Sequence, residues 1–446
     1  MSYDPLKANL PDSSQDYIDT YWRATAGEPP EDDGSITDEI DTDVAIIGGG
    51  YTGLSCAYFL SSKYRTKVHV LEAHRPGWGC SGRNGSFIRP AIGRLSWQAC
   101  VDRYGADVAR GLFAEAHRAL ATMRELIDIG QIDCQQQPDG WLKVAHHPGR
   151  IDMLRHEQRL LRDMFGYEVE FLSAAMLRER SFVSAEGFSA LRFPDAFSAH
   201  PLKVALGLVR MARAAGARVH ARSPVVGWHR DGSIHRLITP NGLVRARQVV
   251  IATNGYSTEK LHPCLKSRLI PVLSNIIVTR PLSDQERHDA GIASTDIITD
   301  TRKVLNYYRL LPDGRILLGS RGAITESLKG TESISRVLLN TLVTKFPALK
   351  NITVDYRWGG WVALSMDSMP RIHSLADDST ISYAIGYNGS GTSAATYAGR
   401  VLADRIGSEK PVFSVFDTPL PSVPLASFRR LGQRAAFALY RYQDAR

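Results

Sequence analysis

The earliest apolar run with the length and composition of a buried strand is DVAIIG, residues 43–48, in which β-branched side chains precede glycine. Residues 51–64 follow with apolar positions at helical spacing, and KVHVLEA, residues 67–73, predicts a second strand. A strand, a helix and a strand within about thirty residues form a right-handed βαβ unit. The pattern therefore predicts a parallel sheet that begins near Asp41.

Later segments repeat this alternation. Residues 201–221 predict a helix followed by a strand, residues 245–257 a buried strand that ends in turn residues, and residues 380–406 a strand, a glycine turn and a helix. Between residues 266 and 361, three β-rich segments and a Pro-Asp-Gly hairpin signal predict an antiparallel sheet. The intervening helical patterns, such as residues 107–130, indicate an excursion into another lobe.

A chain of 446 residues is too long for one core, so two domains are expected. The fold class predicted is α/β and α+β: a Rossmann-like nucleotide-binding domain with a second substrate domain built on an antiparallel sheet. The predicted boundaries are 1–37 for an N-terminal arm, 38–100, 196–258 and 372–410 for the nucleotide-binding domain, 101–195 and 259–371 for the substrate domain, and 411–446 for a basic C-terminal segment.

Composition adds limits on location and partners. No long apolar run or signal-peptide pattern is present, and five cysteines without CxxC spacing argue against a disulfide framework or a metal site, so a reducing cytoplasm is expected. The formal net charge is +8, but lysine and arginine are scattered along the chain without a basic-aromatic motif. Nucleic acid is therefore not expected as a partner.

The ends of the chain carry two distinct patterns. GEPPEDDGSITDE, residues 27–39, has the composition of a solvated linker. Near the C-terminus, residues 427–446 predict a basic helix with one apolar stripe. Packing of this helix on the protein's own surface is the favoured interpretation, and attachment to a membrane surface is the alternative. The stripe consists of Phe428, Leu431, Ala435, Leu439 and Tyr442.

Gly48, Gly50 and Gly53 form a G-x-G-x-x-G motif between the first predicted strand and its helix. They suit a tight turn, close approach of the backbone to a pyrophosphate, and close packing of helix on strand. The helix N-terminus near Tyr51 offers free N–H groups to phosphates. Glu72, at the end of the second strand, can accept hydrogen bonds from ribose hydroxyls. Together these features predict dinucleotide binding.

A second glycine-rich loop, HRPGWGCSGRNGS, follows at residues 74–86 and is not required by an NAD domain. FAD adds a large isoalloxazine to the pyrophosphate, and this loop can offer hydroxyl, amide and guanidinium donors while its backbone lies close to the ring. The loop therefore favours FAD over NAD. The residues expected to serve it are Ser81, Gly82, Arg83, Asn84 and Gly85.

The sequence resembles the FAD-dependent D-amino-acid oxidase/glycine oxidase superfamily over nearly its whole length. The resemblance implies that the Rossmann-like domain is an FAD-binding domain. One departure is Ser86, where the family usually has a second glycine next to the expected flavin face. The motifs that carry the resemblance are VAIIGGGYTGLS, VLEAHRPGWGCSGRNGS, SAHPLKVA, NYYRLLPDGRILLG, DYRWGGWVALSMDSMPRI and GYNGSGTSAATYAGRVLA.

The resemblance also implies which residues hold the cofactor. Val226 is expected at the adenine end through its backbone, and the NGSGT turn at the flavin pyrimidine, where a helix N-terminus can stabilise negative charge. No cysteine lies in this C-terminal region, so noncovalent FAD is expected. The further residues implied in FAD binding are Thr52, Ala73, Trp78, Gly79, Ala252, Thr253, Asn254, Gly389, Ser390, Gly391 and Thr392.

The activity implied by the resemblance is oxidation of the C–N bond of a small amine or amino-acid derivative of the γ-glutamylputrescine type. Hydride transfer would give an imine that hydrolyses to a carbonyl product, with O2 reduced to H2O2. Arg89 or Arg309 could form a fork on a substrate carboxylate. For His200, capping of a helix is favoured over a role in the pocket. The other candidates for the cleft are Tyr256, Tyr308 and Trp361.

Two alternatives remain open at this point. A dehydrogenase would keep FAD but pass electrons to a membrane quinone or a protein acceptor. A noncatalytic flavoprotein would act as a binding or regulatory subunit. Motif spacing does not determine the amine, its stereochemistry or the oligomeric state.

Overall fold

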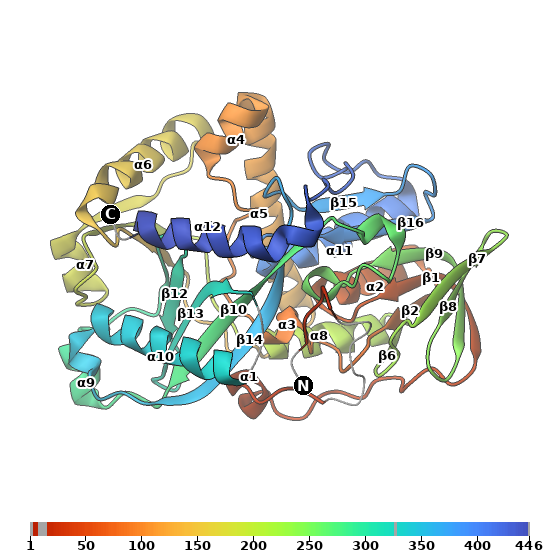
Figure 1. Ribbon diagram of the computed structural model, residues 1–446, viewed down its shortest axis with the longest axis horizontal. Coiled ribbons are helices and arrows are strands. Elements are labelled where there is room, and N and C mark those ends of the chain that lie inside the picture. Colours follow the sequence, from red (N-terminus) through yellow and green to blue (C-terminus); the bar gives the residue numbers. More distant parts are fainter. Residues whose placement is uncertain (1–2, 8–15, 325–327, 445–446) are drawn as a thin grey trace.

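A computed structural model describes residues 3–7, 16–324 and 328–444. Figure 1 shows two lobes, each built around one of two eight-stranded sheets. The predicted fold class is confirmed: one sheet is largely parallel and covered by helices, and the other is largely antiparallel. Among the described residues, no helix combines the length and apolar character needed to cross a bilayer.

The first sheet has the strand order β15-β16-β9-β1-β2-β6, and the β7–β8 hairpin joins β9. The pairs from β16 to β6 are parallel, and β15 is antiparallel to β16. Its strands come from three separated parts of the chain. They are β1 (Glu39–Ile47), β2 (Val68–Leu71), β6 (Arg218–His220), β7 (Gly227–Asp231), β8 (Ile234–Ile238), β9 (Leu243–Ile251), β15 (Arg371–Ser374) and β16 (Ile381–Ile385).

Helix α2 (Tyr51–Tyr64) packs between α8 (Pro201–Ala214) and α11 (Gly391–Ser408), and α11 also contacts α5 (Ala106–Ile129). Together these helices and the strands of the first sheet enclose the largest apolar core. The approach of α11 to α2 depends on Gly399, because a Cβ there would lie 2.0 Å from the Oγ of Ser55. This packing fixes the positions of two helix N-termini relative to the sheet.

The second sheet has the order β14-β10-β13-β12-β11-β3-β5-β4. Its pairs are antiparallel except for β3 and β11, which run parallel. Strands β10 and β14 pair over their full length and extend toward the first lobe. The strands are β3 (Trp141–Val144), β4 (Glu170–Ser173), β5 (Ser189–Phe193), β10 (Ile270–Thr279), β11 (Ile297–Asp300), β12 (Asn306–Leu310), β13 (Ile316–Ala323) and β14 (Val354–Leu364).

Helices surround this second sheet, and α10 packs its apolar side against it through Leu338 and Leu342. The remaining helices are α1 (Tyr21–Thr25), α3 (Cys80–Arg83), α4 (Trp97–Tyr104), α6 (Ile151–Phe165), α7 (Ala174–Arg180), α9 (Asp284–Asp289), α10 (Leu328–Lys345) and α12 (Arg429–Asp444). The short 3₁₀ helices are η1 (Pro148–Arg150), η2 (Asn254–Tyr256), η3 (Pro263–Leu265), η4 (Pro347–Leu349) and η5 (Ala426–Phe428).

The described part of the N-terminal arm packs on the protein; most of residues 27–39 are exposed, as a solvated linker would be, but Asp33 and the buried Ile36 anchor the segment. Trp22 is buried, and its indole donates to the carbonyl of Asn84 over 2.9 Å. Asp33 accepts hydrogen bonds from Arg213, Arg218 and the N–H of Val219. The acidic composition suggested solvation because the partner arginines lie about 180 residues away in sequence.

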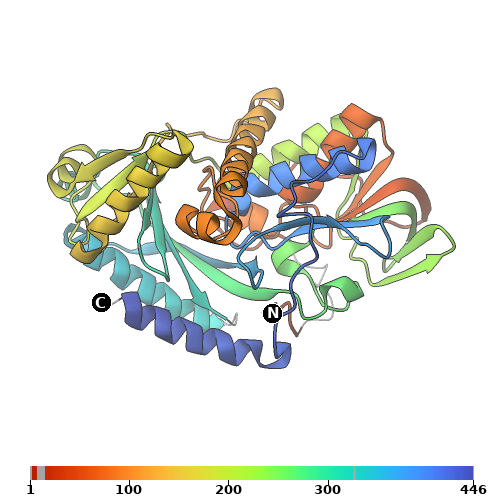
Figure 2. The same ribbon diagram turned by 90° about the horizontal axis from the view of Figure 1, so that it is seen from above.

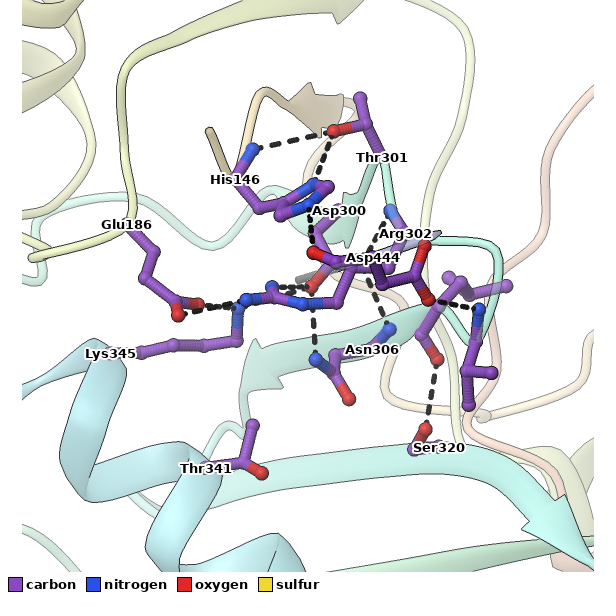
Figure 3. Close-up of polar contacts among 12 residues, drawn as sticks. His146, Glu186, Asp300, Thr301, Arg302, Asn306, Ser320, Thr341, Lys345 and Asp444 are labelled. Atoms are coloured by element: carbon purple, nitrogen blue, oxygen red, sulfur yellow. Dashed lines mark hydrogen bonds and ion pairs between the residues drawn. The ribbon is translucent and has the colours of Figure 1, made fainter. Parts of the chain in front are cut away.

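A buried network of charges ties α10 to the second sheet (Figure 3). The Nζ of Lys345 lies 2.8 Å from Glu186 and 3.1 Å from Asp300. Arg302 lies between the same two carboxylates, at 2.6 Å from Asp300 and 2.8 Å from Glu186. Two cations therefore balance two anions. Although burial opposes ionisation of Asp300, Lys345 and Arg302 hold its pKa below the usual value.

Candidate cofactor cleft and active site

The turn between β1 and α2 lines a long cleft. Gly48 has φ 112°, and a Cβ there would lie 2.8 Å from the carbonyl oxygen of Ala252. At Gly53, a Cβ would lie 2.0 Å from the carbonyl oxygen of Gly48. Gly50 caps α2 without a side-chain hydrogen bond, so the helix N-terminus faces the cleft with its positive dipole end. This geometry suits a pyrophosphate.

Glu72 follows β2 and lines the cleft next to this turn. One carboxylate oxygen accepts the N–H of Gly49 at 2.7 Å, and the other accepts the N–H of His74 at 2.9 Å. Each oxygen retains a second lone pair, which can accept a ribose hydroxyl. Burial raises the pKa of Glu72, and the backbone donors offset part of that shift.

The second glycine-rich loop contains the short helix α3. The Oγ of Ser81 accepts the N–H of Tyr51 at 2.9 Å, which links the loop to the start of α2. The amide of Asn84 donates to the carbonyls of Cys80 and Ser81. These bonds lock the loop against the G-x-G-x-x-G turn, so that Ser81 and Asn84 line the cleft.

Arg83 and Ser86 sit at the inner side of this loop. The Arg83 guanidinium lies 3.8 Å over the Trp78 ring, its Nε donates to the Trp78 carbonyl, and its buried Nη2 has no hydrogen-bond partner in the described chain. Ser86 has φ 58°, the left-handed conformation that glycine adopts most readily. Its buried Oγ accepts the N–H of Ala199, so the side chain is turned into the protein and does not reshape the cleft.

Two more segments complete the cleft. Ala252, Thr253 and Asn254 follow β9 and line it, as the resemblance implied. Val226 does not line the cleft: its side chain is solvent-exposed and its N–H donates to the carbonyl of Ile238, which leaves its carbonyl for the expected backbone contact. Its neighbours Pro224 and Val225 line the cleft instead.

The start of α11 lines the same cleft. Gly389 has φ 86°, and a Cβ there would lie 2.0 Å from the Arg321 guanidinium. Ser390 caps α11 without a side-chain bond to the helix, because its Oγ donates to the carbonyl of Gly93. Gly391 and Thr392 therefore present the N–H groups of a helix N-terminus to the cleft.

The donor set fits FAD. The cleft has an empty volume of about 1150 Å³, and the N-termini of α2 and α11 both line it. Glycines occupy the positions where a Cβ would clash, and Arg83 retains an unused buried donor. The predicted residues that line this cleft are Gly48, Gly50, Tyr51, Thr52, Glu72, Ala73, Trp78, Gly79, Ser81, Asn84, Ala252, Thr253, Asn254, Gly389, Gly391 and Thr392. Gly53 and Gly82 do not line the cleft. They allow the backbone behind it to pack closely against Gly48 and Gly77.

A chamber with an empty volume of about 760 Å³ joins the cleft where both are lined by Cys80, Asn84, Val362, Gly389 and Thr392. The chamber is further lined by residues of the glycine-rich loop and of the second sheet. A much larger vestibule, with an empty volume of about 3040 Å³, shares a border with the chamber and has α12 along one wall. The residues at that border are Arg89, Thr299, Leu305, Arg321 and Ser390.

Three arginines line the chamber: Arg83, which stacks on Trp78, and the pair Arg89 and Arg321. Within the described residues, Arg321 on β13 donates to the carbonyls of Asn388 and Gly389, at 3.2 and 3.4 Å. Arg89 lies 4.6 Å over the ring of Trp141. In the described chain neither forms an ion pair with a carboxylate. Burial lowers the pKa of Arg321 to about 9 and that of Arg89 to about 10.

Of the six predicted catalytic residues, the structure brings two to these cavities. Tyr256 lines the cofactor cleft, and Arg89 lines the chamber. Tyr307 lines the chamber as well, with its hydroxyl 2.8 Å from that of Ser274, and sequence reasoning missed it together with Arg321, Cys80 and Val362. Gly319 on the neighbouring strand could have indicated the position of Tyr307, because it makes room for the tyrosine ring. A Cβ at Gly319 would lie 2.3 Å from the Tyr307 ring.

The other four line none of the three cavities. Tyr308 points to the opposite side of β12 and packs with Phe182 and Phe346. Trp361 is buried on the far side of β14, where its indole donates to the carbonyl of Tyr3. These two assignments are wrong because strand neighbours alternate between faces, which places Tyr307 and Val362 at the chamber.

Arg309 and His200 have structural roles. The Arg309 guanidinium is buried and donates to Gly85, Gln137, Ser198 and Ala199, which leaves none of its nitrogens for a ligand and holds the glycine-rich loop in place. His200 caps α8 by accepting the N–H of Lys203. Burial lowers the pKa of His200 to about 3, so the ring is neutral at physiological pH. The capping interpretation of His200 therefore matches the structure.

Comparison with known proteins places the chain among flavoenzymes. Residues 43–405 match the family model DAO, described as FAD dependent oxidoreductase. Gamma-glutamylputrescine oxidoreductase of Escherichia coli K12 is 32% identical over 417 residues, which cover 93% of this chain and 95% of that protein.

Solved structures show the same fold. L-proline dehydrogenase from P. horikoshii superimposes with a TM-score of 0.72 at 20% identity, covering 85% of this chain and 97% of that one. Glycine oxidase from Geobacillus kaustophilus superimposes with a TM-score of 0.71 at 20% identity, covering 86% of this chain and 99% of that one.

Proposed function

The chain belongs to the DAO family of FAD-dependent oxidoreductases, and we propose that it oxidises the C–N bond of a small amine that also carries a carboxylate. Family membership establishes an FAD-dependent amine or amino-acid oxidoreductase. The requirement for a carboxylate comes from this chain's own chamber.

The observation that carries this proposal is the pair Arg89 and Arg321, which line the chamber without an acidic partner in the described chain. Removing a guanidinium from water without an anion is unfavourable. A substrate carboxylate in the chamber would supply that anion and accept charge-assisted hydrogen bonds. The chamber borders the end of the cleft where α11 begins, so the bound carboxylate would hold the amine beside the cofactor site.

The same charges bear on the protonation of the amine. A cationic chamber disfavours an ammonium ion and lowers the pKa of a bound amine, which favours the neutral form with a free lone pair. Apart from its arginines, the titratable groups described in the chamber lining are Cys80 and Tyr307. Burial raises the pKa of Cys80 to about 11 and that of Tyr307 to about 12, so neither acts as a base near neutral pH.

Catalysis by this chain therefore consists of positioning and electrostatics. When bound, FAD supplies the acceptor for the hydride that leaves the carbon next to nitrogen. The N-terminus of α11 faces the cleft and favours negative charge there. The imine would hydrolyse to a carbonyl product and an amine or ammonia, and O2 would take up the two electrons to give H2O2.

A γ-glutamylputrescine-type substrate is the form of this proposal that we favour. The relative from Escherichia coli is named for that substrate and is similar over nearly its full length. The large vestibule outside the chamber leaves room for an extended substrate. We further propose that FAD is held noncovalently, with no cysteine in the segment that opens α11.

An anaerobic titration of the purified protein tests the proposal. The panel comprises γ-glutamylputrescine, putrescine, pipecolate, sarcosine and D-amino acids, and the signal is the visible absorbance of the flavin. We expect bleaching by a member that has both an amine and a carboxylate, with recovery of the colour and formation of H2O2 on admission of air.

Three other outcomes would contradict parts of this account. Bleaching by putrescine but by no carboxylate-bearing amine would contradict the role of the arginine pair. Bleaching without recovery of the colour in air would contradict the use of O2 and would indicate a dehydrogenase. A protein that binds no flavin even after reconstitution with FAD would contradict the central inference.

A further inference from the structure

The C-terminal helix α12 exposes its apolar stripe to solvent, and part of the stripe, Phe428 and Leu431, also borders the vestibule. Leu431 is 63% exposed and Leu439 52%, and the preceding turn adds Leu425 at 78% and Phe428 at 64%. These side chains are spaced so that Phe428, Leu431 and Leu439 fall on one side of the helix, with alanines between them. A contiguous row of exposed large apolar side chains is characteristic of an interaction surface.

The opposite side of α12 is held on the protein by polar contacts. Near its start, Arg430 and the buried Gln433 both donate to the carbonyl of Pro271, and Arg430 also pairs with Asp4. Near its end, the Asp444 carboxylate accepts the N–H groups of Lys303 and Val304, and its carbonyl contacts His146 (Figure 3). The basic helix therefore packs on the protein through the side that carries Arg430, Gln433, Phe437 and Tyr440, and not through its apolar stripe.

Contacts at both ends fix the orientation of the helix. It runs along the outside of the molecule from the junction of the two lobes toward the second sheet (Figures 1 and 2). Because these contacts hold the side that carries Arg430 and Gln433 against the protein, the apolar stripe cannot turn inward without breaking them. The exposed stripe is therefore a fixed feature of the surface.

The charges beside the stripe are positive. Arg434 and Arg441 are exposed along one flank of α12, and neither forms an ion pair in the described chain. The exposed side chains of Arg94 and Lys303 lie around the C-terminal end of the helix. Asp444 is the one acidic residue of α12. Its carboxylate already accepts the N–H groups of Lys303 and Val304, in the loop before β12. The surface therefore suits a partner that offers an apolar layer to the stripe and negative charges to the arginines beside it.

We propose that α12 docks the enzyme on the surface of an anionic lipid bilayer, with its stripe at the level of the acyl chains and its arginines among the phosphates. Amphipathic helices with leucine and aromatic side chains on one side and arginine on the other bind in this way. A second copy of the chain is a poorer occupant, because a two-fold contact through α12 would bring together two copies of the unpaired Arg434 and Arg441, and the one acidic residue of α12, Asp444, is already held by Lys303 and Val304. This inference does not depend on the proposed substrate.

Flotation of the purified FAD-loaded protein with vesicles tests the proposal. We expect co-flotation with vesicles of phosphatidylcholine and phosphatidylglycerol, and at least about tenfold less bound protein with phosphatidylcholine alone or in high salt. A variant with Leu431→Ser and Leu439→Ser, and another with Arg434→Gln and Arg441→Gln, should each lose at least about tenfold of the binding. The flavin spectrum and the unfolding temperature show whether these variants are folded.

Matched control variants make the same kinds of substitution at exposed positions away from α12. Ile129→Ser with Val183→Ser removes two exposed apolar side chains away from α12, and Arg247→Gln removes an exposed arginine from the first lobe. These should float like the unmodified protein. No flotation with anionic vesicles would overturn the proposal, and so would equal flotation of the α12 variants. A concentration-dependent dimer that the same substitutions dissociate, without flotation, would assign the stripe to a second copy.

Discussion

Arg321 and Arg89 are the single residues on which the substrate proposal depends. Replacing Arg321 by Met keeps an extended side chain but removes the charge and the donors. Because a hydrogen bond to a charged group contributes about 1.5–3 kcal/mol, we expect kcat/KM for a carboxylate-bearing amine to fall roughly 10- to 150-fold. The loss should appear mainly in KM, measured by steady-state kinetics of H2O2 formation.

A matched substrate distinguishes recognition from general damage at Arg321. The corresponding carboxamide lacks the negative charge, so its kinetics should differ little between the Arg321→Met variant and the unmodified enzyme. Arg89→Met should behave in the same direction, whereas Arg247→Met on the first lobe should change neither substrate's kinetics. Equal losses for the acid and the amide would contradict carboxylate recognition by Arg321.

A substitution at Gly53 tests whether the cleft holds FAD. A Cβ at this position would lie 2.0 Å from the Gly48 carbonyl oxygen, so Gly53→Ala must move α2 away from β1. We expect the purified variant to retain less than about a tenth of the FAD, because the phosphate turn is distorted. The ratio of flavin to protein absorbance measures this. Gly432→Ala is the control, since a Cβ there meets nothing within 4 Å, and it should keep full FAD content.

At the scale of elements, Lys345 anchors α10 to the second sheet. Lys345→Met would leave the buried carboxylates of Asp300 and Glu186 with Arg302 alone. Breaking a buried ion pair costs about 3–5 kcal/mol, so the free energy of unfolding measured with denaturant should fall by about that amount. Arg336→Met, at an exposed position of the same helix, should change it by less than about 0.5 kcal/mol. Equal effects would contradict the role of the network.

Asp33 gives the N-terminal arm a dependence on pH. Burial opposes ionisation, but the bonds from Arg213, Val219 and Arg218 prevail and lower the pKa of Asp33 to about 2. Since the folded pKa is depressed, the stabilisation is complete above the unfolded pKa of about 4 and is lost as the pH falls toward 2. Asp33→Asn should therefore lower stability at neutral pH and reduce its decline between pH 4 and pH 2, as followed by thermal unfolding. An unchanged pH profile would contradict this.

Elements formed by neighbouring residues could be predicted from the sequence, and the faces of the central strands could not. The βαβ unit at residues 43–73 was evident because its apolar spacing, glycines and terminal Glu72 are all local. In β12, by contrast, nearly every residue is buried, so no alternation of polar and apolar positions shows which side Tyr307 or Tyr308 takes. The assignment of Tyr308 to the cleft failed for this reason, whereas Arg309 shares the face of Tyr307 and failed because its guanidinium is engaged by Gly85, Gln137, Ser198 and Ala199.

At the scale of the whole molecule, the active site is assembled where the two lobes meet. The glycine-rich loop and the start of α11 come from the first lobe, and Tyr307, Arg321 and Val362 come from strands of the second sheet. Arg89 and Arg321 are more than 200 residues apart in sequence and line the same chamber. Motifs predicted the cofactor half because each is contiguous, but the chamber depends on how the lobes pack.

The most direct test of the central claim is the anaerobic rate of flavin reduction, measured by stopped flow with an amine that carries a carboxylate and with its carboxamide. We expect both compounds to reduce the bound FAD, and the acid to do so at least about tenfold faster at equal concentration below saturation. We also expect Arg321→Met to remove this difference. Two results would contradict the claim. One is that no amine of the panel, as acid or as carboxamide, reduces the bound FAD, and the other is that the acid and the carboxamide reduce it at equal rates in the unmodified enzyme.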